Sequence, residues 1–218
     1  MANCSALISS GIVTLSDGVG LDQIILANNV SNVIVENTRM TNASSGPGLY
    51  VNQSSNFTIN EDIISDSVYG DRIDGSSYGQ VRNTEIYNIT GSSIQGLELI
   101  NSNHIDLDTI SAHNNDANGI YLSSSDNNSL TNVQAYNNAQ NGIYMVNTSD
   151  NNSLSGIVAS GNTNYGIFIQ SSSDHNSFTN VQAYGSVVGL QSDGSMYNIY
   201  NNISTYNNAY GTYLSYTS

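Results

Sequence analysis

The sequence predicts an all-β fold, a right-handed single-stranded parallel β-helix, which is a solenoid of about eight coils. Two observations carry this prediction. Glycines recur at nearly constant intervals, and apolar residues keep the same positions after each of these glycines. A third observation excludes helical repeats, because Gly, Asn and Ser interrupt every stretch that could carry a 3.6-residue apolar period.

The glycines define the repeat and its first strand. The phrase Gly119-Ile-Tyr-Leu returns as Gly142-Ile-Tyr-Met and as Gly166-Ile-Phe-Ile. Its side chains alternate between inward and outward positions, as in a short strand. Coils of 22–26 residues follow from the spacing of Gly48, Gly70, Gly96, Gly119, Gly142, Gly166, Gly189 and Gly211.

Each coil is expected to hold two further short strands, which makes three. Ser129-Leu-Thr-Asn-Val-Gln-Ala-Tyr matches Ser177-Phe-Thr-Asn-Val-Gln-Ala-Tyr, with apolar residues at the same positions of the phrase. We therefore expect Leu130 and Val133 to be buried. The chain is read as a single domain, residues 1–218, with less regular coils at 1–47 and regular repeats at 48–218.

The ends of the rod raise the question of partners. One coil cannot bury its apolar side alone, and eight coils stacked about 4.8 Å apart make a rod of roughly 40 Å. Open strand edges usually need a cap. Residues 1–19 show no amphipathic period, and Gly211-Thr-Tyr-Leu ends the pattern on a strand. Either the chain is a piece of a longer helix or another molecule covers each end. For the second case we expect self-association through these uncapped ends, which would give a head-to-tail fibre.

Charge and composition exclude several classes of function. Three basic residues against seventeen acidic ones give a net charge of −14, which repels nucleic acid and anionic membranes. No apolar stretch approaches the roughly 18 residues that membrane insertion needs. The lone Cys4 allows no intramolecular disulfide. Scarce lysine with abundant Asn and Ser favours an extracellular or cell-surface location.

Two rows of aromatic residues are expected on the surface, because stacked coils turn equal offsets into ladders. Such rows either stabilise the sheet surface or bind a glycan or a surface protein. The 15 Tyr without Trp favour the ladder over a dedicated sugar platform. One row comprises Tyr50, Arg72, Glu98, Tyr121, Tyr144, Phe168 and Tyr213, and the other comprises Tyr87, His113, Tyr136, Tyr184 and Tyr206.

Three aspartates are expected to stack at equivalent corners. Asp126, Asp150 and Asp174 each precede a polar turn pair, and Asn in such turns tolerates left-handed backbone angles. Stacked carboxylates either point into water or hold a calcium ion, which accepts oxygen ligands. We expect solvated turns, with calcium as the alternative and no other cofactor.

The candidate catalytic residues lie near the middle of the chain. In His104-Ile-Asp-Leu-Asp108 the alternation points His104, Asp106 and Asp108 outward, and Arg82 lies one coil earlier, near Asp108. Paired carboxylates beside a basic residue suit acid–base or metal-assisted cleavage of polysaccharides. The alternative is an ion pair of Arg82 with Asp106 or Asp108 on a solvated sheet.

The repeats resemble a known family. The unit that begins Asn118-Gly-Ile-Tyr-Leu and continues with Ser125, Asn128 and Leu130 resembles the parallel β-helix repeats of archaeal and bacterial surface proteins. It also resembles the periplasmic copper-site accessory protein of nitrous oxide reductase. The resemblance covers 48–218 and implies the fold. Related helices include pectate lyases, polysaccharide hydrolases, alginate epimerases, phage tailspikes and non-catalytic adhesins.

Two activities of these relatives lack their residues here. The consecutive motifs of polygalacturonase-like hydrolases (Asn-Thr-Asp, Asp-Asp, His-Gly and Arg-x-Lys) are absent from the chain. Copper needs clustered soft or imidazole ligands, and we expect His104, His113 and His175 to fall in different rows. The sequence therefore favours a non-catalytic extracellular structural or adhesive protein, with a polysaccharide-active enzyme or a viral fibre or spike segment as alternatives.

Overall fold

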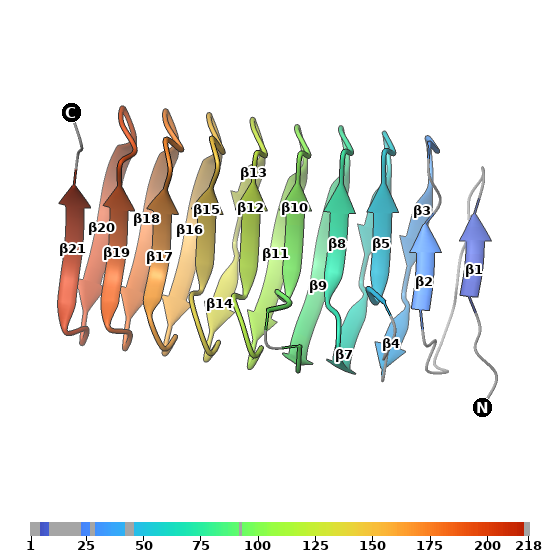
Figure 1. Cartoon of the computed structure of the whole chain (residues 1–218), viewed down its shortest axis with the longest axis horizontal. Coiled ribbons are helices and arrows are strands. Elements are labelled where there is room, and N and C mark those ends of the chain that lie inside the picture. Colours follow the sequence, from blue (N-terminus) through green and yellow to red (C-terminus); the bar gives the residue numbers. More distant parts are fainter. Residues whose placement is uncertain (1–4, 9–22, 27–28, 42–45, 92, 216–218) are drawn as a thin grey trace.

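The computed structural model of the chain describes residues 5–8, 23–26, 29–41, 46–91 and 93–215. These residues form parallel strands, without any helix among them, stacked along one axis into a rod (Figure 1). Within the described ranges no helix is long and apolar enough to cross a membrane. Cys4 lies outside the described part. So do most of residues 1–19, for which the sequence predicts no cap.

The first strand of every coil belongs to one sheet, called the first sheet. Its ten strands pair in chain order, so each lies between the strands of the coils before and after it. They are β1 (Ser5–Ile8), β2 (Gln23–Leu26), β5 (Leu49–Asn52), β8 (Asp71–Asp74), β10 (Leu97–Ile100), β12 (Ile120–Ser123), β15 (Ile143–Val146), β17 (Tyr165–Gln170), β19 (Val188–Asp193) and β21 (Tyr210–Ser215).

The second and third predicted strands share another sheet, called the second sheet. They are separate in some coils and continuous in others, where one strand runs through the corner. Its strands are β3 (Ile34–Glu36), β4 (Arg39–Thr41), β6 (Thr58–Asn60), β7 (Ile63–Ser67), β9 (Gln80–Ile89), β11 (Asp106–His113), β13 (Ser129–Thr131), β14 (Gln134–Tyr136), β16 (Ser153–Ser160), β18 (Ser177–Tyr184) and β20 (Ile199–Tyr206).

The corner between these two strands is made by residues with left-handed backbone angles. Asn83 has φ 50°, Asn132 has φ 54° and Asn180 has φ 55°, each at the same position of its coil. Asn tolerates this conformation better than most residues, and Gly156 adopts it at the equivalent corner with φ 67°. The recurrent Asn of the sequence thus bends the second sheet around the core.

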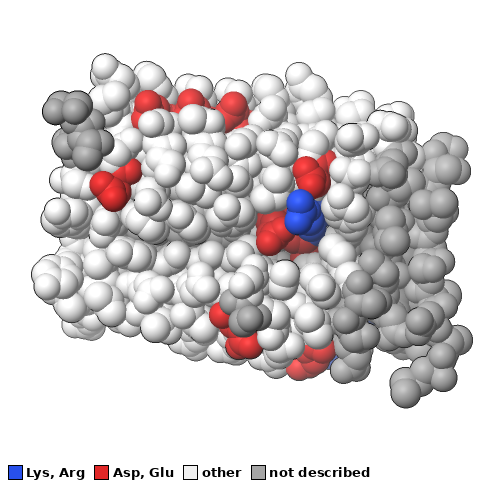
Figure 2. Space-filling view, in the orientation of Figure 1, with Lys and Arg blue, Asp and Glu red and all other residues white. Residues whose placement is uncertain are grey.

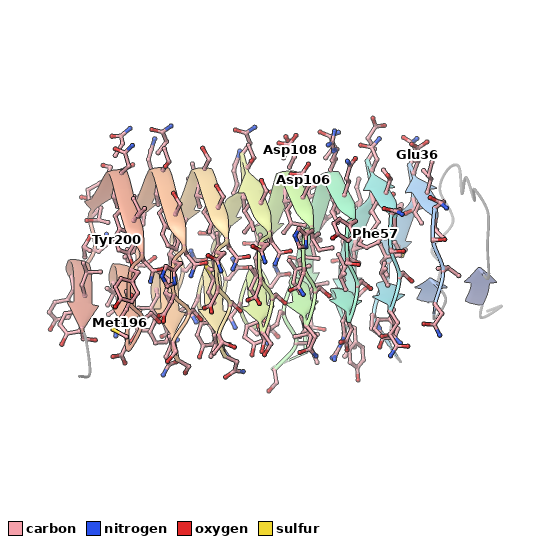
Figure 3. The ribbon with its side chains drawn as sticks, turned by 90° about the horizontal axis from the view of Figure 1, so that it is seen from above. Glu36, Phe57, Asp106, Asp108, Met196 and Tyr200 are labelled. Carbon is pink, nitrogen blue, oxygen red and sulfur yellow. The ribbon has the colours of Figure 1, made fainter. Side chains whose placement is uncertain are left out.

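The register confirms the repeat read from the sequence. Leu130 pairs with Leu107 on one side and Leu154 on the other, and both Leu130 and Val133 are fully buried. The inward positions of successive strands form one hydrophobic core along the axis of the rod. Figure 3 shows the labelled Phe57 and Tyr200 between the two sheets, where this core lies.

Polar side chains inside the corners satisfy the backbone there. The Oδ1 atoms of Asn152 and Asn176 accept hydrogen bonds from the backbone N–H groups of Asn128 and Asn152, both at 2.8 Å. Serine hydroxyls form a similar ladder at another corner, where Ser125 Oγ accepts from Ser102 N–H at 3.1 Å. These ladders pair buried backbone groups that would otherwise cost about 1–3 kcal/mol each.

Candidate functional site

The outward side chains of the first sheet form the first row that the sequence predicts. Strand register aligns Tyr50, Arg72 and Glu98, and continues through Tyr121 and Tyr144 in the next two coils. The structure adds Gln191, which the sequence pattern passed over. The complete first row is Tyr50, Arg72, Glu98, Tyr121, Tyr144, Phe168, Gln191 and Tyr213.

The rings of the first row touch one another. The Tyr144 and Phe168 rings are parallel, with centroids 5.1 Å apart, and Tyr165 stacks on Phe168 at 4.5 Å. Tyr121 is tilted by 54° relative to Tyr144, so the parallel stack ends there. Tyr144 Oη donates a hydrogen bond to Gln170 Oε1 at 2.8 Å. The row therefore combines the ladder that the sequence favours with hydroxyl and amide groups that face outward.

A hollow of about 270 Å³ lies at one end of the first row, over β5, β8 and β10. We call it the Arg72 groove. Tyr69, Ile94 and Gln95 help to line it, and the last two come from a segment between Thr90 and Gly96 that lengthens this coil. The 26-residue interval from Gly70 to Gly96, the longest between successive repeat glycines, is the sequence signal of this wall.

Arg72 is held between two carboxylates in this groove. Its Nη2 lies 2.8 Å from Asp74 Oδ2, and its Nη1 lies 3.5 Å from Glu98 Oε2. Burial raises the pKa of Glu98, although the charge of Arg72 lowers it in part. Figure 2 shows a blue patch with red atoms beside it on this face of the rod. Both terminal nitrogens of Arg72 therefore face a carboxylate.

A second hollow, of about 440 Å³, lies at the other end of the first row. We call it the Tyr213 groove. It spans β17, β19 and β21 and is mostly aromatic and aliphatic. Its lining is Tyr165, Val187, Val188, Gln191, Tyr210 and Tyr213.

The second predicted row lies on the second sheet. Tyr87, His113 and Tyr136 align as predicted, and the rings of Tyr87 and Tyr136 stack on either side of His113, at 5.1 and 4.5 Å. His113 Nε2 lies 3.0 Å from Glu85 Oε1. The row continues through Ser160 to Tyr184 and Tyr206, whose rings also stack.

The predicted catalytic candidates lie on the second sheet, away from both grooves. Figure 3 shows Asp106 and Asp108 on the far side from the first sheet. Arg82 pairs with Asp108 in register, and its Nη2 forms an ion pair with Asp106 Oδ2 at 3.1 Å. His104 is exposed, but with φ 57° it belongs to the preceding turn and stacks on Tyr78 at 4.8 Å. The four residues do not meet around one point.

The three predicted turn aspartates do stack, and they bind backbone rather than each other. Asp126 Oδ1 accepts the N–H of Asp150, and Asp150 Oδ1 accepts the N–H of Asp174, at 2.8 and 2.7 Å. Burial raises the pKa of Asp150, and the hydrogen bond from the Asp174 amide lowers it in part. One oxygen of each side chain thus has a structural partner. Among the residues that the structure describes, no three or more His, Cys, Asp or Glu are grouped to hold a metal.

One expectation about histidine was wrong. His104 and His175 occupy the same row of turn positions rather than different rows, since each N–H donates to the carbonyl of the next coil through an identical ladder. The turns of Asn127 and Asn151 lie between them, so the two imidazoles are three coils, or about 14 Å, apart. His113 lies on a strand of the second sheet. The three imidazoles are therefore too far apart to bind one copper ion together.

Two carboxyl groups lie inside the rod. Asp62 and Asp71 occupy inward positions, and each is almost fully buried. Burial raises the pKa of Asp62 to about 7, and burial together with the nearby Asp62 raises the pKa of Asp71 well above its usual value. One oxygen of each accepts a backbone hydrogen bond, from Thr38 at 2.8 Å and from Leu49 at 3.1 Å. The other oxygen of each has no hydrogen-bond partner in the described part.

The sequence did not single out the Arg72 groove as a site. Arg72 and Glu98 were placed side by side in the first row, but Asp74 was not joined to them. The signal was a pair of opposite charges in one ladder beside the longest coil. Nothing in the pattern alone indicated that Asp62 and Asp71 would lie close to each other inside the rod.

Comparisons with known proteins agree with this architecture. A mutant of the periplasmic alginate epimerase AlgG aligns with a TM-score of 0.73 at 12% identity, covering 95% of this chain and 59% of that one. Pectate lyase Pel9A aligns with a TM-score of 0.62 at 15% identity, covering 93% and 70%. The Dettilon tailspike protein aligns at 0.50 and 12%, covering 97% and 61%. At these identities the likeness is one of fold.

The chain spans about three fifths of the alginate epimerase. No curated protein matches the sequence. Residues 68–204 match the family described as the right handed beta helix region, which is more than half of the chain. This protein therefore belongs to the right-handed β-helix family.

Proposed function

We propose that this protein is a non-catalytic, extracellular or cell-surface β-helix that binds polysaccharide along its first sheet. The observation that carries the proposal is the first row, a continuous line of aromatic and polar side chains with a hollow at each end. From β5 to β21 this line crosses seven strand spacings, or about 34 Å. An extended polymer is the ligand that such a long, narrow track fits.

The chemistry of the row supports a glycan rather than an apolar partner. Sugars present C–H faces that pack on aromatic rings and hydroxyls that bond to polar groups at the ring edges. Tyr121 and Tyr144 supply rings, and Gln170 and Gln191 supply amides beside them. The ring faces of Tyr144 and Phe168 cover each other, so a glycan would contact the middle of the row at ring edges and hydroxyl groups.

The test compares two tyrosines that differ in the sheet they occupy. Titration calorimetry against a panel of oligosaccharides is expected to find binding by the wild type. Tyr144→Ala on the first row should weaken it about tenfold, since an aromatic contact contributes about 1–1.5 kcal/mol. The matched change Tyr136→Ala on the second sheet should leave affinity within twofold. Equal losses in both variants would contradict the proposal.

The non-catalytic part is tested separately. Prolonged incubation of each bound glycan with the protein should release no new reducing ends and no unsaturated products. Turnover that disappears in Asp106→Asn or Asp108→Asn would favour the polysaccharide-active alternative and those residues. Turnover that disappears in Glu98→Gln would favour the same alternative at the Arg72 groove.

A fibre subunit is a second candidate, favoured by one observation. In the last described coil Leu214 stands at an inward position of β21, yet 42% of it is exposed because no further described strand stacks on it. Exposed strand edges with apolar inward positions pair with another strand. Sedimentation at rising concentration is expected to show end-to-end oligomers, and a monomer at every concentration would contradict this candidate.

A further inference from the structure

We infer that the glycan bound on the first sheet is uncharged, and that the Arg72 groove rejects polyuronates. This inference rests on the proposed function and adds the chemical class of the ligand. It sets the protein apart from its structural neighbours named as an alginate epimerase and a pectate lyase, whose named substrates are acidic.

The first step is that the groove offers no free cation. Arg72 is the one basic side chain on the described outward face of the first sheet, because Arg39 and Arg82 stand on β4 and β9 of the second sheet. Both of its terminal nitrogens lie against carboxylates, Asp74 at 2.8 Å and Glu98 at 3.5 Å. A uronate approaching Arg72 would therefore meet the two carboxylates beside it.

The second step is that the groove is surrounded by negative charge. Asp74 and Glu98 together outweigh Arg72, and Asp193 adds another carboxylate further along the same face. The whole chain carries a net charge of −14. Like charges at close range cost binding free energy, and this repulsion weakens with added salt.

The third step is that the same groups suit sugar hydroxyls. Carboxylates accept hydrogen bonds from hydroxyls, and hydrogen bonds to a charged acceptor are stronger than neutral ones. Tyr50 and Tyr69, which also line the groove, provide ring surface next to these acceptors. An uncharged, hydroxyl-rich chain therefore finds both kinds of contact without a charge penalty.

The experiment uses a ligand pair that shares one backbone and differs in charge through methyl esterification, together with neutral glucans, mannans and xylans that control for the added methyl group. Polygalacturonate and its fully methyl-esterified form share a backbone, so their affinities for the full chain compare charge directly. At low salt we expect the ester to bind at least tenfold more tightly than the acid, with the ratio shrinking as salt rises. Equal binding, or tighter binding of the acid or of alginate, would overturn the inference.

Charge-removing variants give a second readout. Asp74→Asn with Glu98→Gln frees Arg72 and should raise affinity for polygalacturonate at least fivefold relative to the ester. Asp106→Asn, which frees Arg82 on the opposite sheet, is the matched control and should leave the ratio unchanged. An unchanged ratio in the double variant would count against the groove as the selective element.

Failure of the two proposals can be told apart. Binding restricted to polyuronates overturns the uncharged-ligand inference alone and leaves the glycan-binding function standing. Absence of binding to every polymer, charged or uncharged, overturns the glycan-binding function and this inference with it.

Discussion

The coils of β5–β11 and those of β12–β19 share one register but differ in where they place ionisable groups. In the earlier coils the inward positions include Asp62 and Asp71. In the later coils the same inward rows hold Val133 in place of Asp62 and Ile120 in place of Asp71. The difference teaches that the interior of the later coils is a purely apolar frame at these positions, while the earlier coils carry the buried carboxyl groups.

The outer surfaces differ in the same direction. Every described ion pair lies in the earlier coils, at Arg72, Arg82 and His113. The later coils carry Asn and Ser ladders, the stacked rings of the first row and the backbone-bonded aspartates Asp126, Asp150 and Asp174. A repeat that neutral ladders hold together needs no ion pairs, and among the described residues the ion pairs are confined to the earlier coils.

The largest expected effect is a carboxylate placed in the regular frame. Leu130→Asp should lower the free energy of unfolding by at least about 4 kcal/mol, because the buried charge has no amide partner like those of Asp62 and Asp71. Urea denaturation measures it, with the outward Thr131→Asp as control. If Leu130→Asp had the same urea midpoint as Thr131→Asp, the later coils would tolerate a buried carboxylate as the earlier coils do, which would contradict the comparison.

The buried acids of the earlier coils predict a pH dependence. Their raised pKa values mean that the folded chain binds more protons than the unfolded chain between about pH 4 and 7. Stability should therefore fall as pH rises through that window, by up to about 4 kcal/mol for Asp62 alone, and level off below pH 4, where both states are protonated. Denaturation of wild type and of Asp62→Asn with Asp71→Asn at each pH checks it. A loss equally steep in the double variant would place its cause elsewhere.

The amide ladder of the later coils predicts a medium effect. Asn152→Ala removes the acceptor of the Asn128 N–H and two donations from Asn152 Nδ2, to Ser125 O and Asn176 Oδ1. The expected loss of stability is about 2 kcal/mol. Asn151→Gly, at the adjacent exposed left-handed position, should change stability by only a few tenths of a kcal/mol. Similar losses in the two variants would contradict a role of the ladder as frame.

The smallest expected effect is at the exposed ion pair of the earlier coils. Arg82 and Asp106 are 41% and 39% exposed, so their attraction is screened by water. Asp106→Asn should change the unfolding free energy by less than about 1 kcal/mol. A change above 2 kcal/mol would show that this pair belongs to the structural frame after all.

The fold could be predicted from the sequence because every coil of a stacked repeat has the same register, so each coil is independent evidence for it. Leu130, Val133 and both aromatic rows fall where equal offsets placed them. Positions along a ladder are fixed by the period, so the alignment of Tyr50 with Arg72 and Glu98 needed no structure. The continuity of the second and third strands was not predicted, because a single left-handed Asn leaves the strand pairing intact on both sides of the corner.

The candidate site was harder to predict, because function here departs from the repeat. A hollow needs side walls, and the walls of the Arg72 groove come from an irregular segment whose path no period fixes. The closeness of Asp62 and Asp71 arises across the core, between the corner before β7 and the start of β8. Offsets give neighbours along a sheet but not across the interior. His104 was misplaced for a related reason, since its positive φ ends the simple alternation of inward and outward side chains.

A crystal structure with the tightest-binding oligosaccharide of the panel tests the central claim most directly. We expect sugar rings along the first row, against Tyr121 and Tyr144, with hydroxyls donating to Glu98 and Asp74 at the Arg72 groove. Sugar bound to the second sheet around Tyr136, or an empty first row at saturating ligand, would contradict it.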